Sequence, residues 1–491
     1  MKFSFKNILF GLIVSSLFVN CTDNDDNLLQ DSNTEVQNFI WKGLNNYYLW
    51  QQNVPDLDDM RFGNPFFLND FLKTKGAPEQ VFQSLLYKPV SLFGASNQAI
   101  DKYSIIVDDY SILENSFQGI RTTSGISADY KYVSGNSGPI FGFVRYVLPN
   151  SDAANKNVKR GDLFYAINGT TLTLANRNSL LAADNYTMNF ASFVNGTLTP
   201  NGVSLALTKS QMIENPIHIV KSITVGSKKI GYLMYNAFTA NFDLDLNNAI
   251  GQLSAGNITD LVLDLRYNGG GSIQTATYLA SMITGQFNGQ VFAKEQWNPR
   301  LQTYLLANNP NALTNFFVNN IAGVGINHLN LSKVYILTTE RTASASELVI
   351  NGLKPYIDVI QIGTKTIGKN AGSVTLYDSP NFGKSGANRN HKYAMQPLVL
   401  KIVNKDNFGE YENGLLPQTS NTLSENVDNL GILGDANEPM LKKALDLIGF
   451  RNRGLRQNPT RVFENIENDL QDFTNEMYID RLPIGLEQFF K

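Results

Sequence analysis

A strand, turn and helix unit that occurs twice constrains the fold of this chain more than any other feature. Residues 261–265 form an apolar run with one acid, which is typical of a strand buried on both faces. An Asn-Gly-Gly-Gly turn follows at residues 268–271, and Ser272 can then cap a helix. Residues 334–337 and the helix expected from Ser344 repeat the arrangement. Strands and helices that alternate in this way predict an α/β domain.

Both turns place backbone groups at the start of a helix, where free N–H groups face negative charge. Gly269, Gly270 and Gly271 have no side chains, so this backbone can approach a substrate carbonyl and direct an N–H at a developing oxyanion. Glycines also occur in ordinary tight turns. Residues 342–347, Thr-Ala-Ser-Ala-Ser-Glu, bring hydroxyls to the other helix start, where a serine is more often a cap than a nucleophile. Either turn alone therefore has a purely structural explanation.

Three segments taken together resemble the tail-specific, or C-terminal processing, serine peptidases of the S41 type. They are residues 264–271, 342–347 and 362–369, which agree with that family in order, composition and spacing. In the family a lysine base follows the serine nucleophile by 25 residues, and Lys369 follows Ser344 by this distance, which selects Ser344 over Ser346. The resemblance implies a crotonase-like α/β peptidase core and a Ser-Lys dyad.

The resemblance also implies roles for the neighbouring backbone. A lysine accepts a proton only when it is neutral, so we expect the site to lower the pKa of Lys369 by burial and by keeping carboxylates away from it. The amine would take the Ser344 proton during attack and later donate to the leaving amine. The oxyanion is expected at the N–H of Ala345 and at one from the glycine turn, either Gly270 or Gly271. No cofactor is expected.

Other polar residues near these motifs have open or structural interpretations. Some family members carry a glutamine four residues after the lysine, where this chain has Ser373, so Ser373 substitutes for it or the role is absent. Three roles account equally well for Glu347: a hydrogen bond to groups near Ser344, capping of the helix, and solvation at the surface. Asp264 and Arg266 are expected to support the glycine turn. His218, His328 and His391 have no motif around them, which argues against a histidine-based triad.

Residues 105–212 change to short β-like runs between Gly, Asn and Asp turns, a pattern that resembles a PDZ domain. Residues 138–143 occupy the position of that family's carboxylate-binding loop. We therefore predict that Ile140, Phe141 and Gly142 bind peptide, because a PDZ groove takes a C-terminal tail as an added strand. The alternative is an unrelated small β domain.

The N-terminus has the pattern of a secretory signal. Lysines precede an apolar stretch at residues 8–19 that is too short to span a bilayer comfortably. It ends at Cys21, the single cysteine, and acidic and polar residues follow. This resembles a bacterial lipoprotein signal, which implies that Cys21 is lipidated and that the protein is anchored in the cell envelope, facing the periplasm or the cell surface. The alternative is ordinary cleavage that leaves an incidental thiol.

The whole chain is expected to contain six segments. They are a signal peptide at 1–21, a polar tether at 22–31, a helical domain at 32–104, the PDZ-like domain at 105–212, the peptidase domain at 213–437 and a helical tail at 438–491. Forty basic residues against 43 acidic ones, with no basic block, argue against nucleic acid as a partner. Three dispersed histidines and one cysteine give no metal-site spacing.

The leading hypothesis is a serine endopeptidase that recognises polypeptides by their C-terminal tails. A catalytically silent, PDZ-containing peptide-binding lipoprotein is the alternative from another class, although a silent protein has no evident reason to keep a buried lysine. An unrelated α/β acyl hydrolase is a third possibility, and the absence of a Gly-x-Ser-x-Gly elbow argues against it.

Overall fold

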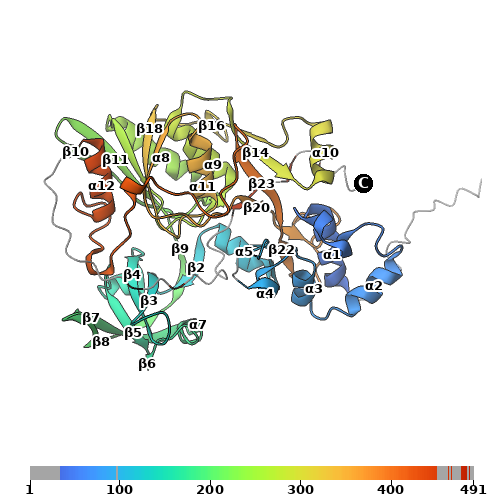
Figure 1. Ribbon diagram of the computed structural model, residues 1–491, viewed down its shortest axis with the longest axis horizontal. Helices are drawn as coiled ribbons and strands as arrows, with labels where there is room; N and C mark the ends of the chain where they lie inside the picture. Colours follow the sequence, from blue (N-terminus) through green and yellow to red (C-terminus); the bar gives the residue numbers. More distant parts are fainter. Residues whose placement is uncertain are drawn as a thin grey trace, which may run out of the picture.

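The fold consists of an N-terminal helical region, a β-rich domain and a larger body of sheets and helices (Figure 1). The computed structural model describes residues 34–94, 98–449, 463, 466, 477–480, 482, 483 and 486. Cys21 and the predicted signal and tether lie outside the described residues. Within those ranges, no helix is both long enough and apolar enough to cross a membrane.

The N-terminal region is built from short helices that bury their apolar faces. Phe39, Ile40 and Leu44 recur at helical spacing and are buried on the first helix. Proline at the first position of the next two helices costs no hydrogen bond there. The helices are α1 (Glu35–Tyr47), α2 (Pro65–Lys73), α3 (Pro78–Ser84) and α4 (Val90–Phe93).

Five strands form the central sheet of the large body, in the order β10-β11-β12-β18-β19. The last four are parallel, and β10 is antiparallel at one edge. Helices cover both faces, which explains the continuous apolar runs in β12 and β18. The strands are β10 (Ile217–Val225), β11 (Lys228–Tyr235), β12 (Asp260–Asp264), β18 (Lys333–Thr338) and β19 (Asp358–Gly363). The helices are α8 (Asp243–Ala255), α9 (Ile273–Thr284) and α11 (Ala345–Leu353) on one face and α12 (Pro439–Ile448) on the other.

A second, mixed sheet packs against α9 and α11 on the side away from the central sheet. Its order is β13-β24-β20-β23-β14-β15, so strands from distant parts of the chain lie next to one another. They are β13 (Gly271–Ser272), β24 (Met477–Tyr478), β20 (Ala371–Ser373), β23 (Leu398–Asn404), β14 (Val291–Trp297) and β15 (Thr314–Phe316). Helix α10 (Pro299–Asn308) and a hairpin of β16 (Asn320–Ile321) and β17 (Val324–Gly325) flank it.

The β-rich domain lies below the central sheet in Figure 1 and begins later than the expected residue 105. Strand β1 (Ile105–Val107) pairs with β22 (Ala394–Gln396) of the large body, and β22 also pairs with β21 (Leu376–Tyr377). After α5 (Tyr110–Phe117), β2 (Ile120–Thr123) pairs with β9 (Ser210–Ile213), so the chain enters and leaves the domain along one ribbon. Between them lie β3 (Ile126–Tyr132), β4 (Ile140–Val147), α6 (Asp152–Asn155), β5 (Leu163–Ile167), β6 (Thr170–Thr171), α7 (Arg177–Ala182), β7 (Asn185–Val194) and β8 (Thr197–Thr208).

Candidate active site

Ser344 lies in the turn that leads from β18 into α11, at the N-cap of the helix. Its backbone has φ +65° and ψ −118°, a conformation that a residue with a side chain rarely adopts. The side chain has no exposed surface, and its Oγ has no hydrogen-bond partner among the described residues. A strained serine at a strand-to-helix turn is the arrangement that presents a nucleophile.

The serine turn and the glycine turn are joined by the carbonyl of Asn268. This oxygen accepts hydrogen bonds from the N–H of Ala343 and from Oγ of Ser346, each at 3.1 Å. The Ser346 hydroxyl is therefore engaged in holding the two turns together, whereas the Ser344 hydroxyl is not. This difference favours Ser344 as the reactive serine, in agreement with the 25-residue spacing to Lys369.

The glycine turn adopts backbone conformations that only glycine tolerates. Gly270 and Gly271 have φ of 120° and 137°, and a Cβ on Gly271 would lie 2.2 Å from the carbonyl oxygen of Phe238. The N–H of Gly270 donates to Oδ1 of Asn268 at 2.9 Å. Gly271 is itself a strand residue that pairs with Met477 and forms a bridge to Phe238, so the geometry does not single out one of the two glycines as the oxyanion donor that acts together with Ala345, the first residue of α11.

Lys369 lies in the loop between β19 and β20 and is only 1% exposed. Its backbone N–H donates to Oε2 of Glu347 at 2.8 Å, and the N–H of Ser344 donates to the same oxygen at 2.8 Å. One carboxylate thus links the backbones of the two predicted dyad residues. The ring of Tyr103 lies over the Lys369 ammonium, 4.7 Å from Nζ to the ring centroid, so a residue that precedes β1 covers the lysine.

Glu347 is fully buried and accepts four hydrogen bonds. Besides the two N–H groups above, Oε1 accepts from Oγ1 of Thr366 at 2.5 Å and from the N–H of Gly368 at 2.7 Å. Burial raises the pKa of this carboxyl to about 7, although the four donors act to lower it. The sequence alone did not distinguish capping from surface solvation as the explanation of Glu347. The structure excludes solvation and gives Glu347 a positioning role, for which the Ser-x-x-Glu spacing was the available signal.

Ser373 is also near the lysine loop, but its hydroxyl is occupied. Its single O–H lies within hydrogen-bond distance of two acceptors, Oε1 of Gln396 at 3.2 Å and the carbonyl of Met477 at 3.1 Å, and donates to one of them at a time. Gln396 is fully buried on β22. A glutamine therefore does lie beside position 373, supplied by a different strand than the one the family pattern suggests.

Asp264 and Arg266 are fully buried just before the glycine turn, and among the described residues their side chains bond to each other, to Tyr232 and to Glu425 and Glu438 rather than to the backbone of residues 268–271. The guanidinium of Arg266 forms ion pairs with Asp264 at 2.8 Å, with Glu438 at 2.7 Å and with Glu425 at 3.2 Å. A buried guanidinium is tolerated when several carboxylates and hydrogen bonds compensate it. This cluster fixes the end of β12 against the start of α12.

The same cluster connects the peptidase body to the β-rich domain. Arg160 donates to Oε1 of Glu425 at 2.7 Å and to the hydroxyl of Tyr267 at 2.6 Å, and it reaches the carbonyls of Leu430 and Gly431. Although burial acts to raise it, the neighbouring arginines lower the pKa of Glu425 to about 2. Tyr267 directly precedes the Asn-Gly-Gly-Gly turn, so the β-rich domain is held against the glycine turn.

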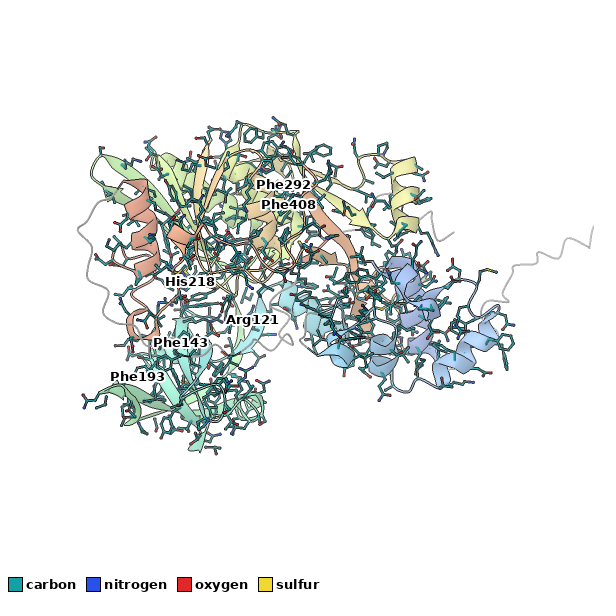
Figure 2. The ribbon with its side chains drawn as sticks, in the orientation of Figure 1. Arg121, Phe143, Phe193, His218, Phe292 and Phe408 are labelled. Carbon is teal, nitrogen blue, oxygen red and sulfur yellow. The ribbon has the colours of Figure 1, made fainter. Side chains whose placement is uncertain are left out.

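A cavity of about 660 Å³ lies between the β-rich domain and the peptidase body, close to the glycine turn. Its walls include β3, α7, β2, the residues Lys209 and Glu214 on either side of β9, and Gly269. The cations that line it are Arg121, Arg145, Arg177, Lys209 and Arg341. Figure 2 shows Arg121 at the junction of the two parts. Arg341, three residues before Ser344, forms an ion pair with Asp129 on β3, so the nucleophile turn is tied to this wall.

Asn236 is a cavity residue that the sequence did not indicate. It is 7% exposed, and neither Nδ2 nor Oδ1 has a hydrogen-bond partner in the described part of the chain. Burying an amide without partners is unfavourable, so the position of the Asn236 side chain beside the glycine turn requires an explanation. An unpaired donor and acceptor at this wall can pair with a peptide bond of a bound chain.

The predicted peptide-binding residues Ile140, Phe141 and Gly142 lie on β4, inside the sheet. Ile140 and Phe141 have no exposed surface, and β4 pairs with β3 on one side and with β5 on the other. A Cβ on Gly142 would lie 2.0 Å from the Phe164 ring. Because a strand is added only to an unpaired edge, this placement argues against β4 and points to β3, which ends the sheet and lines the cavity.

The histidines take part in contacts elsewhere. His391 pairs with Asp378 at 2.9 Å, and the ring of His218 packs on Tyr146 with centroids 4.9 Å apart. Among the described residues, no group of three or more His, Cys, Asp and Glu side chains is arranged to hold a metal ion.

Comparison with known proteins agrees with this geometry. Residues 229–381 match the family described as peptidase family S41, and residues 35–105 match the peptidase S41 N-terminal domain. The chain belongs to peptidase family S41. This S41 chain is 23% identical over 250 residues to carboxyl-terminal-processing peptidase 1 of Arabidopsis thaliana, and 25% identical over 307 residues to peptidase 2 of that plant. These alignments cover 50% and 58% of the chain.

The chain spans about half the length of the curated relatives it matches, 47% and 55% for the two plant peptidases. A protein of Staphylococcus epidermidis that is named as a CtpA-like serine protease is 29% identical over 152 residues, 30% of this chain and 27% of that protein. Among solved structures, an S41 protease from Bacteroides fragilis matches 84% of this chain and 96% of its own with a TM-score of 0.63. At 24% identity this match shows the S41 fold, with mixed helix and sheet, in this chain.

Proposed function

We propose that this S41 protein is a serine endopeptidase that cleaves polypeptides through a Ser344–Lys369 dyad. The observation that carries the proposal is the linkage of the two residues through Glu347. The strained turn leaves Oγ of Ser344 without a partner in the described part of the chain, and the carboxylate that holds its N–H also holds the N–H of Lys369. A purely structural serine would gain from a partner, whereas a nucleophile needs its hydroxyl available for the base.

The reaction follows from these roles. The neutral amine of Lys369 accepts the proton of the Ser344 hydroxyl while Oγ bonds to the carbonyl carbon of the substrate. The N–H of Ala345 and one N–H of the glycine turn, from Gly270 or Gly271, stabilise the resulting oxyanion. When the C–N bond breaks, Lys369 returns the proton to the leaving amine. Water then attacks the acyl-enzyme, again with Lys369 as the base, and frees Ser344.

The β-rich domain is proposed to bind the substrate tail in the manner of a PDZ domain, with β3 as the edge strand. A tail laid along β3 would pass through the cavity that β3, α7 and Gly269 line. Three of the five cavity cations pair with carboxylates, Arg121 with Glu214 and Arg145 and Arg341 with Asp129, and the excess of positive charge that remains favours a terminal carboxylate over an uncharged end. Asn236 would pair with a peptide bond of the segment that leads towards the glycine turn. This route joins recognition of the tail to cleavage upstream of it.

Cys21 is proposed to carry the lipid that anchors the protein in the cell envelope. The proposal is supported by the position of the only cysteine at the end of an apolar signal-like stretch. Several acyl chains together give stable anchoring. The mature protein should partition into detergent, and Cys21→Ser should release a soluble form or block processing. Unmodified protein in the aqueous phase, with an N-terminus other than residue 21, would remove the anchor.

The test of the proposed activity uses residues 22–491 with an unfolded polypeptide, once with a free C-terminal carboxylate and once with an amidated one. We expect fragments with the free substrate, fewer with the amidated substrate and none from Ser344→Ala. Absence of cleavage by the unaltered protein, together with retained peptide binding, would instead support a catalytically silent peptide-binding protein.

A further inference from the structure

The C-terminal strand β24 occupies a place in the molecule that the dyad chemistry does not explain. It lies between β13 and β20 in the second sheet, with Gly271 opposite Met477, Ser272 opposite Tyr478, and Tyr478 opposite Ser373. Strand β13 begins at Gly271, the last residue of the glycine turn, and β20 begins two residues after Lys369. A segment more than 100 residues further along the chain thus lies between the two backbone segments that the reaction needs at a fixed separation.

Polar contacts fix this strand to both neighbours. On the lysine side, the N–H of Ile479 donates to the carbonyl of Ser373 at 3.1 Å, and Oγ of Ser373 donates to the carbonyl of Met477 at 3.1 Å. On the glycine side, Oγ of Ser272 donates to Oδ2 of Asp480 at 2.5 Å. Ser272 directly follows Gly271 and caps α9, accepting from the N–H of Thr275 at 3.1 Å. Asp480 therefore holds the residue next to the glycine turn.

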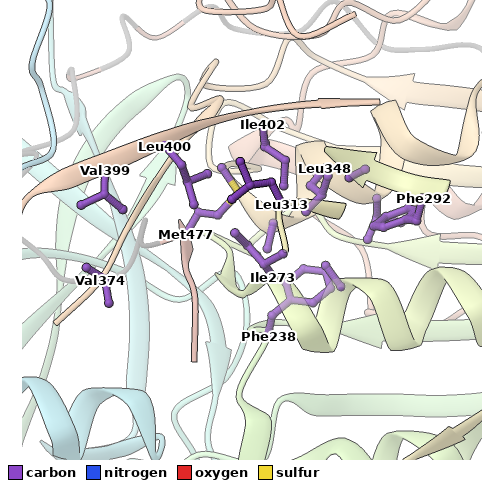
Figure 3. Packing of buried hydrophobic residues seen from close by; sticks show 14 of the residues in the cluster. Phe238, Ile273, Phe292, Leu313, Leu348, Val374, Val399, Leu400, Ile402 and Met477 are labelled. Carbon is purple, nitrogen blue, oxygen red and sulfur yellow. The ribbon is translucent and has the colours of Figure 1, made fainter. Parts of the chain in front are cut away.

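Apolar packing fixes the strand as well. Met477 has no exposed surface and belongs to the core cluster that contains Ile273 and Leu400 (Figure 3). The ring of Tyr478 packs on Phe117 with centroids 4.4 Å apart, and Tyr478 lines a small hollow together with Gly270 and Gly271. Both polar and apolar contacts thus attach strand β24 to the site.

We propose that residues 477–480 are positioning residues of the active site, which hold the glycine turn, the expected source of one oxyanion N–H, and the Lys369 loop at their working separation. The inference rests on the proposed peptidase function. An oxyanion donor acts only within a few tenths of an ångström of its place, and a misplacement of about 1 Å costs about 100-fold in rate. Without β24, β13 and β20 would lose the strand between them, and Ser272 would lose its carboxylate partner.

The first experiment ends the chain after residue 476, with deletion of residues 487–491 as the control truncation. We expect the long truncation to lower kcat for a peptide substrate about 100-fold, with KM changed less than threefold. Adding a synthetic peptide of residues 475–491 should restore activity in a saturable way. Unchanged kcat after truncation would overturn the proposal. Increased kcat would overturn it as well, because it would show that the strand inhibits the enzyme.

Point variants cover the case in which the truncated chain folds poorly. Asp480→Ala should lower kcat about tenfold, whereas Asp480→Asn keeps an acceptor for Ser272 and should stay within about threefold of the unaltered protein. Equal losses in the two variants, or a loss confined to KM, would contradict positioning through the Ser272 contact.

Amide hydrogen exchange separates this inference from the proposed activity, because it requires no substrate. Exchange in Asp480→Ala should rise in residues 269–272 and stay unchanged in β11 and β12. A rise at the glycine turn without cleavage by the unaltered protein would mean that the peptidase proposal fails while the contact is real. Unchanged exchange at the turn would overturn the positioning role even if the enzyme is active.

Discussion

The proposed reaction centre and the cavity beside it differ in how far their polar groups are already paired within the protein. At the reaction centre, Ser344, Glu347 and Lys369 are buried, and one carboxylate fixes the backbones of the other two. The cavity is lined by cations from five separate parts of the chain, and the amide atoms of Asn236 there have no hydrogen-bond partner among the described residues. The difference indicates that the centre has the geometry for chemistry before substrate arrives, whereas the cavity keeps hydrogen-bonding capacity for a ligand.

Removing either dyad residue is the largest change we predict. Ser344→Ala and Lys369→Ala should each lower kcat by at least about 10⁴-fold while the melting temperature stays close to that of the unaltered protein, because the nucleophile or its base is lost. Ser346→Ala is the matched control. It loses one hydrogen bond to Asn268 and should keep most of its turnover. Activity in Ser344→Ala together with inactivity in Ser346→Ala would reassign the nucleophile.

Substitution of Glu347 tests whether kcat depends on the rigidity of the proposed reaction centre. Glu347→Ala should lower kcat about 100-fold, since it frees the N–H groups of Ser344 and Lys369 and leaves the other donors unpaired. Glu295→Gln on β14 is the control, because Glu295 is also a buried carboxyl whose pKa is raised by burial. Similar losses of kcat in the two variants would show that Glu347 acts only on general stability.

The pH dependence of stability gives a second view of Glu347. Its pKa is raised to about 7 in the folded protein, so the native state favours the protonated form. The resulting stabilisation is complete below the unfolded pKa of about 4.5 and is lost as the pH rises to about 7, by about 3 kcal/mol. Glu347→Gln should flatten the free energy of unfolding over this window in urea titrations. An identical slope in both proteins would mean that Glu347 titrates normally.

The cavity is expected to show smaller effects that depend on the ligand. Amidating the C-terminus of a peptide substrate should weaken its binding about tenfold, because a charge-assisted hydrogen bond is worth about 1.5–3 kcal/mol. Titration calorimetry with Ser344→Ala measures this binding without turnover. Equal affinity for both forms would mean that the domain does not read tails, and the enzyme would then be an endopeptidase of unspecified selectivity.

The sequence indicates the proposed reaction centre more fully than the cavity, for a physical reason. The motifs at 268–271 and 342–347 are local, since a glycine turn and a helix start require particular residues at adjacent positions. The alternating strands and helices likewise predicted the α/β body. Glu347 left a partial signal, because its spacing from Ser344 is that of a capping box, but its links to the loop before Lys369 are long-range.

The features that the sequence did not predict depend on which strands become neighbours. Strand β4 has the composition expected of a peptide-binding strand, yet β3 forms the sheet edge, and composition does not state the order of strands. The residues of strand β1 have the same β-like pattern as the β-rich domain that follows them, so the sequence assigns them to that domain. In the structure β1 pairs with β22 instead. Strand β24 consists of two residues whose importance comes entirely from their neighbours.

Asn236 gives the smallest predicted effect and the sharpest contrast between the two regions. Asn236→Ala should raise KM about fivefold and leave kcat nearly unchanged, because it removes a contact to substrate that is the same before and during the reaction. Its thermal stability should stay equal or rise, since the amide is buried without partners among the described residues. Asn247→Ala is the matched control, because Asn247 is a buried asparagine that donates to Gly325 and accepts from Asn327. That variant should lose stability and keep its KM. If Asn236→Ala lost stability and kept its KM as well, the residue would belong to the scaffold, and the cavity would need another contact to hold the substrate backbone.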